Sequence, residues 1–148
     1  MRGLTVLQPW ATLIAIGAKR IETRSWPTSY RGPVLIHAGK SREYLHVAVF
    51  AGWAGPLWGR FPKPEQLPLG AVVAVADLVD CVQMTEAYIA KVPMDERRFG
   101  YYLPGRYAWH LANVRALDKP VPAQGQRGLW RPSQELLKAV ESRVQVAT

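Results

Sequence analysis

A short segment near the N-terminus, Ile21 to Trp26, constrains the fold more than any other part of the chain. Its residues predict a β-strand, and side chains on a strand repeat every two residues. Glu22, Arg24 and Trp26 therefore share one face of this strand. Strands of a small domain usually turn one face to the hydrophobic core. A face that carries a carboxylate and a guanidinium is expected instead to line a site.

A short apolar helix is expected just before this strand. Pro9 suits a first helical turn, because its missing N–H would be unpaired there in any case. Gly17 can take the left-handed conformation that ends a helix. Lys19 then falls at the junction before the strand, so an ammonium group joins the carboxylate and the guanidinium.

Lys19, Glu22 and Arg24 together allow three interpretations. The carboxylate can bind the edge of a base while the cations bind a phosphate. The group can also perform acid–base chemistry, because a lysine beside Arg24 should lose basicity and act as a base near neutral pH. The third interpretation is an ordinary structural ion pair at the edge of a sheet.

The composition indicates one domain over residues 1–148, with 49% hydrophobic and 20% charged residues. The chain has 19 Lys and Arg against 11 Asp and Glu, a net charge of +8. This charge favours polyanionic partners, with nucleic acid first and an acidic membrane surface second. A basic surface that only serves solubility would give the same sum.

Cysteine and histidine usage argues against metal and disulfide chemistry. Cys81 is the single cysteine, which excludes an intramolecular disulfide and predicts a small buried hydrophobe. His37, His46 and His110 lack the spacing of metal ligands, so we expect no metal and no cofactor. No apolar stretch reaches about 18 residues, and the N-terminus lacks the apolar run of a signal peptide. We therefore expect no membrane association and a cytoplasmic location.

The remaining chain predicts about six strands and three or four short helices. Strands are expected over 4–7, 21–26, 34–38, 71–82, 106–114 and 117–121. Helices are expected after Pro9, Ser41, Thr85 and Ser133. The helix after Ser41 should cover 42–50, and the helix after Thr85 should cover 86–91. Segments 52–70, 93–105 and 124–129 are expected to be irregular. Short strands with irregular connections favour an α+β fold, a small and partly closed barrel with helices at its rim.

Further residues are candidates for nucleic-acid contacts. Trp26 is a candidate for stacking on a base, whereas Trp109 alternates with apolar residues and is expected in the core. His37 precedes a helix start that can hold a phosphate, or is a buried, hydrogen-bonded histidine. The full predicted set of contacts is Gln8, Trp10, Lys19, Glu22, Arg24, Trp26, His37, Lys40, Ser41 and Arg127, and the catalytic candidates are Lys19, Glu22 and Arg24.

Several motifs carry a family resemblance. They read LTVLQPWA over 4–11, G-x-K-x-x-E-x-R-x-W over 17–26, YRGPVLIHA over 30–38, GAVVA over 70–74, YAWHLANV over 107–114, PVP over 120–122 and GQRGLW over 125–130. This pattern resembles the ASCH domain family of the PUA-like superfamily. The resemblance implies a PUA-type β-barrel with peripheral helices and a cleft at one barrel mouth, lined by the Lys-x-x-Glu-x-Arg segment.

The resemblance also implies binding of RNA or other nucleic acid. Some members are hydrolases, with ribonuclease action and amidohydrolysis of acetylated cytidine attributed to the family. The amidohydrolase members carry a threonine nucleophile three residues after the lysine. This chain has Glu22 at that position and so departs from the pattern.

The sequence thus supports three hypotheses. The first is a module that binds RNA or single-stranded nucleic acid in a base-sized cleft, where Lys19, Arg24 and Lys40 contact phosphate, Glu22 accepts from a base and Trp26 stacks. The alternative is a metal-independent hydrolase in the same cleft, either a ribonuclease or an amidohydrolase of a modified nucleoside. The third is a small-ligand sensor or a protein adaptor.

Overall fold

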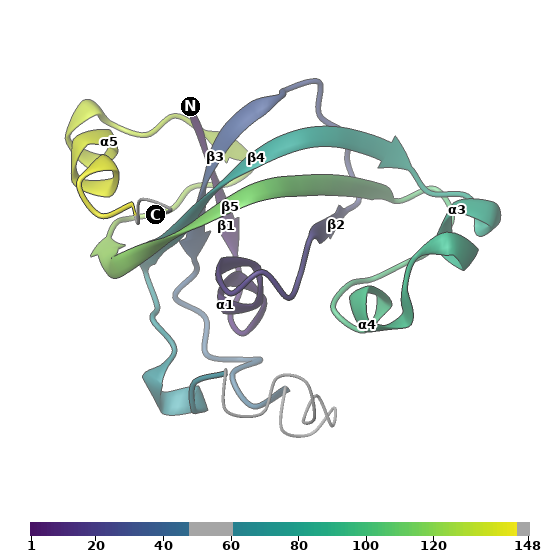
Figure 1. Cartoon of the computed structure of the whole chain (residues 1–148), viewed down its shortest axis with the longest axis horizontal. Helices are drawn as coiled ribbons and strands as arrows, with labels where there is room; N and C mark the ends of the chain where they lie inside the picture. Colours follow the sequence, from purple (N-terminus) through teal and green to yellow (C-terminus); the bar gives the residue numbers. More distant parts are fainter. Residues whose placement is uncertain (48–60, 145–148) are drawn as a thin grey trace.

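A curled sheet of six strands forms the body of the protein (Figure 1). The computed structural model describes residues 1–47 and 61–144. The strands are β1 (Arg2–Val6), β2 (Ile21–Arg24), β3 (Gly32–Ala38), β4 (Ala71–Gln83), β5 (Tyr107–Pro122) and β6 (Leu129–Trp130). Their order in the sheet is β2-β5-β4-β3-β1-β6, with β1 parallel to β3 and the other pairs antiparallel.

Short helices surround this sheet. Within the described ranges they are α1 (Trp10–Ala15), α3 (Glu86–Lys91), α4 (Met94–Arg97) and α5 (Gln134–Glu141), with a 3-10 helix η2 (Pro64–Gln66). In Figure 1, α3 and α4 lie at one end of the sheet and α5 at the other, while α1 lies in the hollow of the curl. This α+β half-barrel of six strands with short helices around it agrees with the predicted fold class.

Bulges let the two long strands curl. The register between β4 and β5 shifts at three places, between Val72 and Ala74, Val75 and Asp77, and Leu78 and Asp80. Each bulge bends a strand and increases its twist. The two stretches predicted separately at 106–114 and 117–121 are therefore one continuous strand, β5.

Two predicted helix starts are confirmed in detail. The Thr85 hydroxyl accepts a hydrogen bond from the backbone N–H of Tyr88 at 3.0 Å, and Ser133 does the same for Leu136 at 3.1 Å. Both residues therefore cap a helix by satisfying an N–H that the first turn leaves unpaired.

Other local predictions need correction. In the described part of the helix expected over 42–50, residues 43–46 form turns and Val47 is helical, and Ser41 Oγ accepts from Glu43 N at 3.2 Å to close a local turn. Residues 48–50 of that expected helix, and 52–60 of the expected loop, lie outside the described residues. The segment 93–105, expected to be irregular, contains α4. Cys81 is half-buried at the margin of the core rather than fully buried.

Alternation along the strands divides the apolar side chains between two faces of the sheet. The inner face packs against α1 and includes Leu4, Val6, Val34, Ile36, Ala74, Ala76, Leu78, Trp109 and Leu111. On the outer face, Leu35, Val72, Val75 and Leu117 pack against α5 through Val140. Elsewhere Ile21, Met84 and Ala108 pack against α3 through Tyr88 and Ile89. Trp109 is fully buried, as predicted.

Replacing Trp109 with alanine should lower the free energy of unfolding by about 3–5 kcal/mol, because it leaves a large cavity in the inner core. Val79→Ala is the matched control, since Val79 is 53% exposed, and it should change the value by less than about 0.5 kcal/mol. Equilibrium denaturation in urea measures both. Equal stability of the two variants would contradict this description of the core.

Candidate functional site

Glu22 lies at the centre of a buried cluster of three charged side chains. It pairs with Trp109 across the β2–β5 ladder, so both point to the inner face of the sheet. Glu22 Oε1 lies 3.6 Å from Lys19 Nζ, and Glu22 Oε2 lies 2.7 Å from Arg24 Nη2. The ammonium, carboxylate and guanidinium that the sequence placed together are therefore in contact.

Lys19 is enclosed by this cluster rather than open to solvent. Its exposed fraction is 0%. Nζ donates to the carbonyl oxygens of Ile21 and Phe99, the latter at 2.8 Å, and faces the Glu22 carboxylate. An ammonium has three N–H donors, so the two carbonyl oxygens take two of them and the carboxylate compensates the charge. Direct contact of Lys19 with a phosphate or substrate stays a prediction, and the burial of its side chain argues against it.

Burial and charge act in opposite directions on the two buried groups. Burial lowers the pKa of the Lys19 ammonium below its usual range, against the opposing charges of Glu22 and Glu96. The lower basicity agrees with the sequence prediction, but desolvation is the main cause and Arg24 a small one. Burial alone would raise the pKa of the Glu22 carboxyl, but Lys19 and Arg24 outweigh it and hold that pKa below its usual range. Glu22 therefore remains ionised.

Arg24 is the member of the cluster that reaches the surface. Its Nε and Nη2 both donate to Glu22 Oε2, and Nη2 also donates to the backbone carbonyl of Thr5 at 2.9 Å. The side chain is 23% exposed. Its two Nη1 N–H groups have no acceptor among the described residues. The guanidinium is thus fixed along one edge and available along the other.

The contact with Thr5 also brings the two edges of the curled sheet together. Strand β6 pairs only with Gly3 and Leu4 of β1, so the edge of β1 at Thr5 is left for Arg24 of β2. We call this junction of β1 and β2 the seam. A side chain rather than a backbone ladder joins the half-barrel here.

Trp26 lies at the same seam, two residues beyond Arg24. Its ring packs edge-on against Trp109, with centroids 4.6 Å apart, and its carbonyl accepts from Trp109 Nε1 at 3.2 Å. A Cβ on Gly128 would lie 4.0 Å from the Trp26 ring, so the loop before β6 passes beside it. The Trp26 side chain is half-buried, which leaves part of it accessible.

Two predicted contacts are internal instead. Gln8 has an exposed fraction of 0%; its Nε2 donates to Thr12 Oγ1 at 2.8 Å and to Pro68 O at 3.0 Å, and its Oε1 accepts from Thr12 N at 3.0 Å. The amide therefore anchors the first turn of α1. Contact of Gln8 with a ligand stays a prediction, and its burial and internal hydrogen bonds argue against it.

His37 is the buried, hydrogen-bonded histidine of the alternative interpretation. Its Nδ1 lies 3.2 Å from Thr5 Oγ1, its Nε2 lies 2.7 Å from Ala123 O, and its exposed fraction is 2%. It ties the loop that begins at Ala123 to β1 and β3. Contact of His37 with nucleic acid stays a prediction, and the burial of its ring argues against it.

The other predicted contacts lie at or near the surface. Lys40 and Arg127 are exposed, Ser41 is half-exposed, and Trp10 is half-buried with its ring edge-on to Tyr44 at 5.3 Å between centroids. Arg127 belongs to the loop that passes Trp26, so it lies near the seam. Their role in binding stays a prediction.

Glu96 is a buried member of the site that the sequence did not indicate. Its carboxylate accepts from the backbone N–H groups of Arg20 at 2.7 Å and Ile21 at 3.3 Å. It thereby fixes the start of β2 to α4, next to the point where Phe99 O receives Lys19. A glutamate in the first turn of a four-residue helix gives no sequence signal for this long-range contact.

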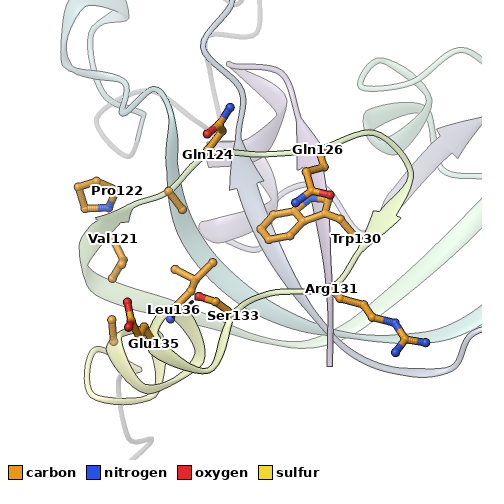
Figure 2. Close-up of a pocket in the computed structure, with 11 residues that line it drawn as sticks. Val121, Pro122, Gln124, Gln126, Trp130, Arg131, Ser133, Glu135 and Leu136 are labelled. Carbon is orange, nitrogen blue, oxygen red and sulfur yellow. Dashed lines mark hydrogen bonds between the residues drawn. The ribbon is translucent and has the colours of Figure 1, made fainter.

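A cavity of about 520 Å³ lies apart from this cluster (Figure 2). It is bounded by α5 and by the segment 121–131, with Trp130, Gln126 and Leu136 among its walls. None of the predicted contacts lines it.

Within residues 1–47 and 61–144, the structure has no group of histidine, cysteine or acidic side chains arranged to hold a metal ion. The same residues form no helix long and apolar enough to cross a membrane.

Comparison with known families decides the classification. The family model of the ASCH domain matches residues 4–121. The chain belongs to the ASCH domain family. ASCH domains have a PUA-like fold, which is associated with RNA binding.

Individual relatives agree with this assignment. The chain is 35% identical over 85 residues to activating signal cointegrator 1 of Mus musculus and to that of Homo sapiens. The match covers 56% of this chain and 15% of each relative, so the chain corresponds to a small part of those proteins. The crystal structure of ASCH from Zymomonas mobilis superposes with a TM-score of 0.58 at 15% identity, covering 97% of this chain and 95% of that one. A mutant of the same protein gives 0.57 at 14% identity, covering 97% and 98%.

Replacing Glu22 with glutamine should lower the free energy of unfolding by about 3 kcal/mol at pH 7, because the buried Lys19 and the partly exposed Arg24 lose the carboxylate between them. The folded pKa of Glu22 lies below its ordinary value of 4.5, so the ionised group stabilises the fold above pH 4.5. That contribution is lost as the pH falls through the folded pKa. The difference between wild type and variant should therefore shrink below pH 4.5.

Denaturant titrations between about pH 3 and pH 7 measure this difference. Glu141→Gln, at the exposed end of α5, is the matched control and should stay within about 0.5 kcal/mol of wild type. A stability difference for Glu22→Gln that is constant with pH would contradict the ionised, buried carboxylate.

Proposed function

We propose that this ASCH domain binds single-stranded RNA at the seam, where Arg24 and Trp26 reach the surface. The observation that carries the proposal is the guanidinium of Arg24. Glu22 and Thr5 hold its Nε and Nη2, while its Nη1 edge has no acceptor among the described residues. The two N–H groups of Nη1, on a guanidinium that is already held in place, can donate to the oxygens of a phosphate.

Positive charge at the surface supports an anionic ligand. In the buried set Lys19 and Arg24 are balanced by the Glu22 and Glu96 carboxylates, so the cation that a ligand meets is the partly exposed Arg24. The whole chain adds a net charge of +8. Because Lys19 and Glu22 lie in a poorly solvated interior, their charges are less screened than those of surface residues.

The roles of the charged residues differ from the first hypothesis. Glu22 is 8% exposed and orients Arg24 rather than accepting from a base. Lys19 forms an ion pair with the other oxygen of the Glu22 carboxylate. Lys40 and Arg127 are exposed and supply further phosphate contacts, and Trp26 offers a partly accessible ring for a base, worth about 1–3 kcal/mol if a base stacks on it.

Hydrolysis of RNA or of a modified nucleoside is the second candidate. The lowered pKa of Lys19 is typical of a general base, and this is the observation that favours it. Its enclosure favours the binding role, because a general base must reach the proton that it removes. The same experiment can separate the two functions.

Arg24→Ala should weaken binding of a single-stranded RNA oligonucleotide by about 10- to 100-fold, because one charge-assisted phosphate contact is lost. Fluorescence anisotropy in a chelating buffer at several salt concentrations measures it. The slope of log affinity against log salt is negative, and its magnitude should decrease by about 0.7, the value for one phosphate on a single strand. Arg24→Lys should recover part of the affinity, since it keeps the charge but loses the planar fork.

Arg143→Ala is the control, because it removes an arginine 44% exposed at the end of α5. The proposed site would be overturned if Arg24→Ala and Arg143→Ala lost RNA affinity equally, or if the affinity of the wild type did not change with salt concentration. Gel analysis of the same RNA tests the second candidate. Cleavage by the wild type that is absent in Lys19→Met would favour hydrolysis.

A further inference from the structure

A loop beside β2 presents large apolar side chains to solvent. Tyr101 is 62% exposed and Leu103 is 49% exposed, in the segment that connects α4 to β5. This loop lies against Thr23, the β2 residue between Glu22 and Arg24. Strand alternation puts Thr23 on the face opposite to theirs. Because β2 is the outermost strand on its side of the sheet, the loop and Arg24 flank one edge strand.

The exposed tyrosine is held in place by hydrogen bonds. Its backbone N–H donates to Thr23 Oγ1 at 3.0 Å, and its carbonyl accepts from Arg106 Nε at 2.9 Å. Arg106 Nη2 also donates to Thr23 O at 3.4 Å. The Arg106 guanidinium lies over the Tyr101 ring, with Cζ 4.6 Å from the centroid. The ring is therefore positioned before any ligand arrives, which lowers the entropy cost of binding.

Gly100 allows this close approach of the loop to β2. A Cβ at this position would lie 2.9 Å from Thr23 Cγ2 and 2.9 Å from the Tyr102 ring. Any other residue would push the loop away from the strand. The contact between the Tyr101 loop and β2 is thus built into the sequence.

We infer that Tyr101 and Arg106 form a stacking platform for a base of the RNA strand, on the opposite side of edge strand β2 from the nucleotide held by Arg24. This inference rests on the proposed function and extends it to a second nucleotide. The guanidinium covers one face of the tyrosine ring, and the exposed remainder of the ring suits a base. Arg106 adds positive charge beside it, which favours an anionic strand over a neutral partner.

Binding of oligonucleotides to Tyr101 variants tests the platform. Tyr101→Ala should weaken the binding of an oligonucleotide of about eight nucleotides by roughly tenfold or more, because stacking of one base is lost. The salt slope should stay that of the wild type, since no phosphate contact changes. Tyr101→Phe should keep most of the affinity, whereas Tyr101→Leu, apolar but not planar, should behave like alanine. The binding of a mononucleotide should not respond to Tyr101→Ala.

The outcomes separate this inference from the proposed function. Val79→Ala is the control and should bind RNA like the wild type, because Val79 is an apolar residue of β4 that is 53% exposed. If Arg24→Ala weakens binding while Tyr101→Ala binds like the wild type, the platform is wrong and the seam remains. If Tyr101→Leu retains the affinity, contact area rather than stacking is responsible and the platform is overturned. If the wild type shows no salt-dependent RNA binding, the proposed function fails and the platform with it.

Discussion

The Glu22 carboxylate is the interaction on which the rest of the site depends. It faces Lys19 with one oxygen and Arg24 with the other, and all three side chains lie within or at the margin of the interior. Buried charges are stable only as a compensated set, and removing one partner leaves the others unpaired in a poorly solvated environment. Through Lys19 the carboxylate is linked to Phe99 after α4, and through Arg24 it is linked to Thr5 of β1. One acidic residue therefore joins segments from three parts of the chain.

The same interaction explains how a half-barrel can close without a continuous ladder. Backbone pairing at the outer edge of β1 ends with the two residues that β6 covers. Beyond that point the Arg24 guanidinium contacts the edge of β1. Its Nη2 donates to the Thr5 carbonyl, and its Nη1 N–H groups have no acceptor among the described residues. A closed ladder would have used every backbone group at this edge. A side-chain closure leaves a polar seam that a phosphate can reach, and so connects the fold to the proposed binding of RNA.

Local signals in the sequence predicted much of the fold. The caps at Thr85 and Ser133 were predictable because capping depends on residues within one turn. The shared face of Glu22 and Arg24 followed from strand periodicity. The burial of Gln8, Lys19 and His37 was not predictable, for the opposite reason. Their partners Pro68, Phe99 and Ala123 lie 60, 80 and 86 residues away along the chain, and no local pattern shows that a polar group will be buried against them. The same limit hid Glu96 and the held position of Tyr101, whose contacts are also long-range.

Nitrogen-15 NMR of the Arg24 guanidinium, recorded with and without a short single-stranded RNA, is the most direct measurement of this account. Because Glu22 and Thr5 hold one edge of the group, its Nη1 and Nη2 resonances should be resolved in the free protein rather than averaged by rotation. Addition of RNA should then shift Nη1 while Nη2 changes little. A single averaged resonance in the free protein, or spectra that RNA leaves unchanged, would contradict a guanidinium fixed by a buried carboxylate and open to a phosphate.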